Sequence, residues 1–320
     1  MLELVNLTGP IFALIGLGWL AVRHGGIERT MLPALGRFVM FFALPALLVR
    51  TLGQRDPVEV INGRFLLAYA AGSLLAMGAG LLWARSQGQP RERAAITAMG
   101  MCCSNSAFVG FPLAVQLVGH EAAVALALCM LVENFLMIPL CLALADSASA
   151  RQQPMHRAIG SAIWGLRRNP IVLGMVAGVL VGTLRTHAGL TLPAVLHKAI
   201  ELLAGASAGV SLFYIGGALV GLQPGQGVRI QVLSVAAGKL LLHPLAVGAL
   251  MLSLPGVPVS LAWAGVVLAG APMLGIYPIL GQRYGLQALN AACMLGATLG
   301  SFVTLGLVIS ALRALLGAPH

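Results

Sequence analysis

Two short segments of this chain share one unusual pattern. Segments 111–119 and 277–285 both read aromatic, proline, aliphatic, two further residues, glutamine, two further residues and glycine. Each lies inside a long apolar run, where proline is unfavourable because it lacks a backbone donor and clashes with the carbonyl group four residues earlier. Each copy therefore predicts an interrupted helix. Paired interrupted helices in the two halves of a membrane chain indicate the binding site of a transporter.

The composition indicates a protein of the lipid bilayer. Of its 320 residues, 59% are hydrophobic and 9% are charged, whereas a soluble protein carries about 25% charged residues. Apolar runs of about 20 residues predict membrane helices, so we expect an all-α integral membrane protein. The net charge of +10 comes from basic residues between these runs, which do not form the basic face of a nucleic-acid-binding protein. The ten predicted spans are 4–23, 31–52, 64–85, 94–118, 121–145, 169–186, 195–222, 230–254, 259–282 and 286–316.

The ten spans divide into two sets of five. An odd number of spans gives the second set the opposite orientation in the membrane, so we predict an inverted five-plus-five repeat. Aligning Pro112 with Pro278 also aligns Gln116 with Gln282, and it places the two broken helices in the fourth and ninth spans. The first repeat, the link and the second repeat are predicted at 1–145, 146–168 and 169–320.

Basic loops set the predicted orientation. With ten spans both termini lie on one side of the membrane, and the opposite side carries the larger share of Lys and Arg. Cytoplasmic loops carry an excess of these residues, so we expect both termini in the periplasm and the 146–168 link in the cytoplasm. Residues 155–168 within this link have the mixed apolar and basic composition of a helix on the membrane surface. The residues of the basic side are Arg23, Arg29, Arg85, Arg91, Arg93, Arg151, Arg157, Arg167, Arg168, Arg229 and Arg283.

Polar residues beside the first motif suggest an anion site. The free N–H groups and partial positive charge of a half-helix suit a carboxylate. Asn105 precedes the motif in an otherwise apolar span, and an amide in lipid needs partners. The neighbouring serines have a second interpretation, hydrogen bonding to their own helix, and Tyr277 is either a pore residue or a packing residue. The predicted substrate-binding residues are Ser104, Asn105, Ser106, Phe111, Pro112, Gln116, Tyr277, Pro278 and Gln282.

Ionisable residues within spans form a second candidate group. Such residues are costly in the bilayer and usually face a cavity or a partner. Glu133, Asn134 and Lys239 are therefore candidates for coupling to an ion or a proton. The alternative for Glu133 is a structural hydrogen-bonding role, and an ion pair between Glu133 and Lys239 is a further option.

Other motifs point away from catalysis. The five cysteines lie within spans without metal-ligand spacing, and no nucleotide-binding, HExxH or GxSxG motif is present. We therefore predict no enzyme activity, no cofactor and no metal site. Glycines repeat every four residues in segments 174–182, 205–209 and 296–300, which predicts faces for close helix packing.

Several motifs resemble those of the auxin efflux carrier family of bacterial and plant transporters. The most specific is 105–113 in the fourth span, and the others are 42–48, Glu133-Asn134, Asn169-Pro170 and 239–244. The resemblance extends along the whole chain. It implies a scaffold part, a moving transport part, and a site where the broken fourth and ninth helices cross. Bacterial members of the family are associated with small organic anions such as malonate and malate, and plant members export auxin.

These observations together favour a transporter of small carboxylates. We expect a secondary carrier or facilitator in the bacterial inner membrane that works by alternating access, with a proton or a sodium ion as the candidate coupling ion. We expect the protein to lie in the lipid bilayer, and a homodimer is one option for its oligomeric state. The alternative is a membrane receptor or sensor that binds an anion without moving it.

Overall fold

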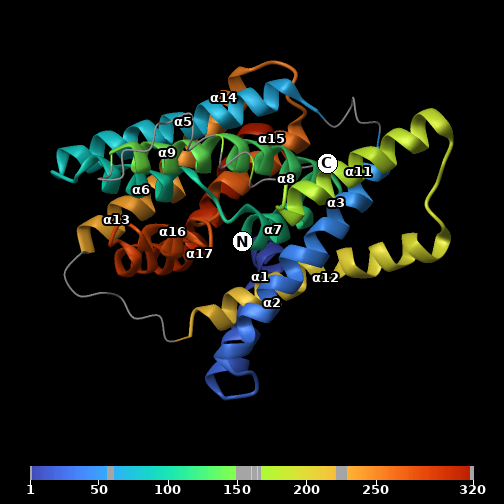
Figure 1. Ribbon diagram of the computed structural model, residues 1–320, viewed down its shortest axis with the longest axis horizontal. Helices are drawn as coiled ribbons and strands as arrows, with labels where there is room; N and C mark the ends of the chain where they lie inside the picture. Colours follow the sequence, from blue (N-terminus) through green and yellow to red (C-terminus); the bar gives the residue numbers. More distant parts are fainter. Residues whose placement is uncertain are drawn as a thin grey trace. The chain divides into compact units, whose positions relative to one another are not determined.

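The computed structural model describes residues 2–55, 61–148, 167–220 and 229–317, together with Gly160 and Trp164. All regular elements in these ranges are helical (Figure 1), apart from an isolated antiparallel bridge between Ser104 and Met273. Most of the 146–168 link, including most of the predicted surface helix 155–168, lies outside the described residues.

Long apolar helices account for most of the described chain. Seven helical stretches have the length and composition to cross a membrane, and three shorter apolar helices accompany them. The multi-pass character predicted from the apolar runs is therefore confirmed, while the count of ten crossings and the inverted repeat stay predictions. The seven stretches are Arg29–Gly53, Gly63–Ser86, Glu121–Ala148, Pro170–Ala188, Ala194–Ala218, Ile230–Ser253 and Gln287–Leu316. The shorter helices are Ala13–Arg23, Ser106–Val118 and Val259–Gly270.

The helices group into two compact units, and each unit draws on both halves of the sequence. This grouping cuts across the predicted repeats, because a repeat is defined by sequence and a unit by packing. Unit 1 comprises Met1–Asn62, Ala107–Leu128 and Arg167–Gly221, and unit 2 comprises Gly63–Ser106, Cys129–Leu166 and Leu222–His320. The helices of unit 1 are α1 (Leu2–Arg23), α2 (Leu32–Phe38), α3 (Leu44–Gly53), α7 (Phe111–Val118), α11 (Pro170–Ala188) and α12 (Ala194–Ala218). Those of unit 2 are α5 (Gly63–Ser86), α6 (Arg91–Cys102), α9 (Ile138–Ala148), α13 (Arg229–Ala237), α14 (His243–Ser253), α15 (Val259–Gly270), α16 (Tyr277–Gln282) and α17 (Gln287–Leu316), while α8 (Glu121–Val132) contributes to both.

Glycines allow close helix contact between α3 and α11 in unit 1. Helices α3 and α11 run side by side (Figure 1). A Cβ added at Gly174 would lie 2.6 Å from the Cα of Pro45, and one at Gly178 would lie 2.7 Å from the carbonyl oxygen of Leu48. The face predicted from segment 174–182 is therefore a real contact. Gly205 and Gly209 on α12 have no atom within 4 Å of an added Cβ among the described residues, so that face makes no contact of this kind there.

This difference predicts the outcome of two matched substitutions. Gly178→Ala is expected to lower the free energy of unfolding by about 1–3 kcal/mol, because the methyl group must push two packed backbones apart. Gly205→Ala has room for its methyl group and gains helix propensity, so its stability should be unchanged or higher. Thermal unfolding of the purified variants measures both effects. Equal stability of the two variants would contradict the packing described here.

Within the described ranges, four π-helical turns each end two residues before a proline. They are Val39–Ala43, Ser106–Gly110, Glu133–Met137 and Gly238–Leu242, and the prolines are Pro45, Pro112, Pro139 and Pro244. The extra residue of a π turn moves the preceding carbonyl away from the proline ring and gives it a later N–H donor. These turns matter for function because two of them contain Glu133 and Lys239.

Candidate substrate site

Both predicted interruptions are present, but neither lies at its motif proline. Helix α6 ends at Cys102, and the chain is extended at Cys103 before a π turn begins at Ser106. Helix α15 ends at Gly270, and α16 begins at Tyr277. Placing the interruptions at the motif prolines was therefore wrong.

The motif prolines lie in the second half-helix instead. Pro278 is the second residue of α16, where the missing N–H would have had no helical partner and the fixed φ of proline suits the first turn. Pro112 is the second residue of α7, but the π turn Ser106–Gly110 runs directly into α7, so this half-helix begins at Ser106 and the π turn accommodates the proline. Each motif then ends at a glycine with positive φ, 57° at Gly119 and 69° at Gly285. The two copies thus end in the same way, but only the second copy begins its half-helix at the motif.

The two interruptions meet within unit 2. Ser104 and Met273 form the antiparallel bridge, and the backbone N–H of Asn105 donates to the carbonyl oxygen of Pro272 at 2.7 Å. A broken helix leaves backbone groups without partners, and in a membrane these must be satisfied within the protein. Pairing the two extended segments satisfies some of them, and side chains satisfy others.

The Glu133 carboxylate accepts hydrogen bonds from donors at and around the first interruption. Its Oε1 accepts from the hydroxyls of Tyr69 at 2.9 Å and Ser106 at 3.0 Å, and from the backbone N–H of Ser104 at 3.2 Å. Its side chain is 4% exposed, and its Oε2 has no hydrogen bond to any described residue. A negative group at the start of the next helical segment is favourable because of the helix dipole.

The Lys239 ammonium donates a hydrogen bond at the second interruption. It donates to the carbonyl oxygen of Ala269, in the last turn of α15, where helical carbonyls lack partners. It also lies 3.0 Å from Nδ1 of His243, one helical turn away. An ammonium only donates, so Nδ1 must accept and the imidazole is neutral with its proton on Nε2. That proton is directed to the hydroxyl of Ser73 at 2.9 Å.

Glu133 and Lys239 belong to one polar cluster without touching. The described residues contain no ion pair between them. They are connected through Ser104, which contacts Glu133 directly and shares the Ala269 carbonyl oxygen with Lys239. Ser104 donates its N–H to Glu133, and its hydroxyl lies 3.5 Å from the same Ala269 oxygen that Lys239 contacts. The two charges are thus set around the crossing, with the carboxylate at backbone donors and the ammonium at a backbone acceptor.

Asn105 stands apart from this network. It is 8% exposed, yet its side-chain amide has no hydrogen bond to any described residue. The amide nitrogen lies 3.8 Å from where a Cβ at Gly275 would be, and Gly275 and Ile276 are exposed. The Asn105 amide therefore lies at the crossing beside an exposed stretch of backbone, and its N–H and C=O groups are available to a ligand.

The remaining predicted residues have local partners or simple packing positions. Gln116 is exposed and donates to the carbonyl oxygen of Pro112 at 3.3 Å, and Asn134 donates to that of Met130 at 2.9 Å. Phe111 is buried in unit 1, while Pro278 is half-buried and Gln282 is exposed on α16. The ring of Tyr277 is buried in unit 2 against Gly100, which favours its packing interpretation.

Sequence reasoning missed three members of the cluster. Tyr69 and Ser73 lie four residues apart in α5, as do Lys239 and His243 in the eighth predicted span. Residues with this spacing share one helix face. Polar pairs four residues apart in apolar helices could therefore have indicated this cluster.

The fold and the crossing together define a class of protein. The described residues are apolar and helical, and two interrupted helices among them pair through their extended backbone, an arrangement characteristic of membrane transporters. The chain belongs to the membrane transport protein family, whose model matches residues 5–309. The resemblance to auxin efflux carriers is thereby confirmed.

The chain is also similar to a bacterial protein described as a transporter. The chain is 31% identical over 316 residues to a protein of Rhizobium meliloti (strain 1021) described as "Putative malonate transporter". The match covers 95% of this chain and 94% of the relative. The family and the relative are both transporters, in agreement with the prediction that the chain is not an enzyme.

Proposed function

We propose that this protein moves a small carboxylate, with malonate as the first candidate, across the bacterial inner membrane by alternating access. The observation that carries the proposal is the buried Asn105 amide, which has no partner among the described residues and lies beside the crossing. An amide nitrogen donates well to a carboxylate, and a hydrogen bond to a charged group is stronger than one between neutral groups. The name of the relative supports the choice of malonate.

The neighbouring groups suit a coupling role. Oε2 of Glu133 has no hydrogen bond to any described residue, although Oε1 accepts three. In this proposal Oε2 takes up a proton or a sodium ion when the carboxylate binds, which limits the repulsion between two negative charges. Lys239 offsets the remaining negative charge from the opposite side of Ser104. The termini are proposed to be periplasmic, following the basic loops.

Counterflow in proteoliposomes tests the proposal. Vesicles loaded with unlabelled malonate are expected to accumulate external radiolabelled malonate transiently, because a carrier exchanges one for the other. Succinate and lactate, added outside, define the preferred number of carboxylates. Imposed pH and sodium gradients, each applied alone, identify the coupling ion by which one drives net uptake.

The receptor alternative makes the opposite prediction. A receptor would bind malonate, and its thermal midpoint would rise with ligand concentration, but labelled malonate would not enter the vesicles. Binding without counterflow would therefore reject the transport proposal. Absence of both binding and counterflow for all three acids would reject the substrate class.

A further inference from the structure

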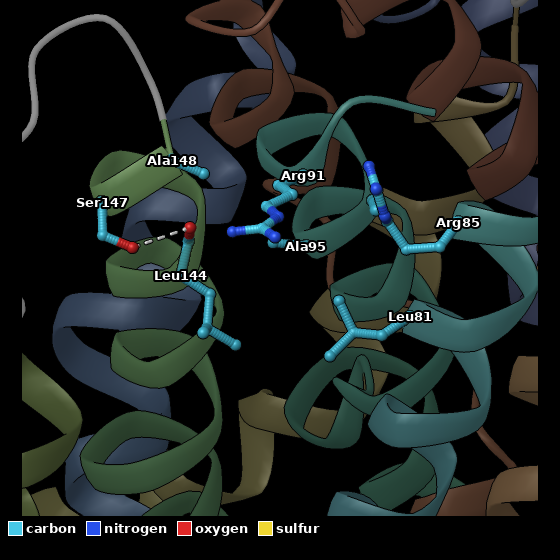
Figure 2. A pocket seen from close by; sticks show the side chains of 8 residues that line it. Leu81, Arg85, Arg91, Ala95, Leu144, Ser147 and Ala148 are labelled. Atoms are coloured by element: carbon cyan, nitrogen blue, oxygen red, sulfur yellow. Dashed lines mark hydrogen bonds between the residues drawn. The ribbon is translucent and has the colours of Figure 1, made fainter. Parts of the chain in front are cut away.

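A pocket in unit 2 lies away from the crossing and has a different chemistry. Its volume is about 360 Å³, and it lies against the first turns of α6, which packs on both α5 and α9. Figure 2 shows two guanidinium groups at one end of this pocket and two leucines toward the other. The lining residues are Leu81, Arg85, Arg91, Ala94, Ala95, Leu144, Ser147 and Ala148.

The arginines of this pocket retain unused donors. Arg91 has no hydrogen bond or ion pair with any described residue, and in Figure 2 its guanidinium extends into the space in front of α9. Arg85 uses Nη1 to contact the carbonyl oxygen of Gln89 at 2.8 Å, which fixes its position and leaves its other N–H groups available. Two guanidinium groups with open donors suit a phosphate or carboxylate group, because each presents N–H groups in a planar fork.

No acidic side chain is among the residues that line this pocket. Asp146 is engaged by the hydroxyl of Tyr284 at 2.6 Å, and Glu92 is not among the lining residues. The lining of the pocket therefore carries two positive charges and no negative one, which favours an anionic ligand.

The depth and lining of the pocket indicate which anion. Arg85 lies in the last turn of α5, Arg91 begins α6, and Ser147 is near the end of α9, so the guanidinium groups lie where membrane helices end. The other end is lined by Leu81 and Leu144. A malonate ion has little apolar surface to place there, whereas a phospholipid carries a phosphodiester next to acyl chains. Basic pockets between helices on the cytoplasmic side are characteristic lipid headgroup sites.

We propose that this pocket binds the headgroup of an anionic phospholipid, with its phosphodiester between Arg85 and Arg91 and its first methylene groups along Leu81 and Leu144. The site is on the side of the membrane that the basic loops predict to be cytoplasmic. It is separate from the proposed carboxylate site, and lipid binding is expected whether or not the protein carries malonate.

Lipid titration of the purified full-length protein tests this site. Short-chain phosphatidylglycerol is added to protein in detergent, and binding is followed by the thermal midpoint and by native mass spectrometry. Short-chain phosphatidylcholine controls for the acyl chains, and glycerol phosphate controls for the headgroup alone. We expect phosphatidylglycerol to bind more tightly than either control, and binding should weaken as salt is added.

Four variants localise the effect. Arg85→Gln and Arg91→Gln should each weaken phosphatidylglycerol binding about fivefold, and the double variant about twenty-fivefold, from about 1 kcal/mol for each basic residue near the membrane surface. Ser147→Glu places a carboxylate at the exposed rim of the pocket and should also displace the lipid. Arg29→Gln is the matched control, because Arg29 is exposed in unit 1 and its side chain has no hydrogen bond or ion pair with any described residue.

Three results would overturn the proposal. The first is unchanged phosphatidylglycerol binding in the double variant. The second is equally tight binding of glycerol phosphate, which would identify a site for a soluble phosphate. The third is loss of malonate binding in the double variant with lipid binding retained, which would assign the pocket to the route of the transported anion.

Discussion

Glu133→Ala is expected to give the largest loss of stability of any single substitution in the site. It leaves the Tyr69 and Ser106 hydroxyls and the Ser104 N–H without their acceptor, in a buried position. Each buried donor left without an acceptor costs about 1–3 kcal/mol. The buried Lys239 ammonium also loses the negative charge of the same polar cluster. We expect low expression, a lower thermal midpoint and no transport.

Two further variants separate the causes of this loss. Glu133→Gln keeps an oxygen that can accept from Tyr69 and Ser106 but removes the charge, so it should recover much of the stability and lose the response to a pH or sodium gradient. Glu121→Ala is the matched control. Glu121 lies 2.6 Å from Arg55, but both side chains are about 30% exposed, and an exposed pair contributes about 0–1 kcal/mol. Equal losses for Glu121→Ala and Glu133→Ala would contradict the role given to the buried cluster.

The helices of this chain could be predicted well because the bilayer imposes a simple rule. A segment that crosses the hydrocarbon must satisfy its backbone within itself and must be apolar along about 20 residues. This rule does not say which helices pack together. The two compact units take helices from both halves of the sequence, and this depends on packing between distant segments such as α3 and α11.

The positions of the interruptions were predicted less well, for a local reason. Proline strongly disfavours the interior of a helix but favours its first turn, so the same motif is compatible with a break at the proline or a restart there. In the second interruption another proline, Pro272, accepts the hydrogen bond from Asn105 and lies within the extended segment itself. The position of the break depends on the extended segment that pairs with it, and that segment lies outside the motif.

The polar cluster shows a similar limit. Glu133 and Lys239 were recognised because a charge in an apolar helix is costly. Their partners Tyr69 and His243 were not recognised from the sequence. The role of each depends on its contact with the Glu133 carboxylate or the Lys239 ammonium. Spacing of four residues pairs them within a helix, but contact between helices requires the fold.

Asn105→Ala is expected to give the largest loss of substrate binding with little loss of stability. The side-chain amide has no hydrogen bond to any described residue, so its removal leaves no described group without a partner. The bond from its backbone N–H to Pro272 does not depend on the side chain. A hydrogen bond to a charged group contributes about 1.5–3 kcal/mol, so malonate affinity should fall about tenfold to a hundredfold. Ligand-dependent thermal shift and counterflow measure the two quantities on the same preparation.

Asn105→Asp and Thr298→Val complete the argument. The aspartate keeps the size of Asn105 but places a negative charge where the carboxylate of the substrate is expected, so binding should be lost altogether. Thr298 is a buried polar residue of unit 2 whose hydroxyl donates to the carbonyl oxygen of Met294 in its own helix at 2.7 Å. Its replacement by valine should leave transport unchanged. Normal malonate affinity in stable Asn105→Ala would exclude Asn105 from the site. A large loss of stability in that variant would instead show that its amide serves the fold, because a group that waits for a ligand can be removed from the empty protein at little cost.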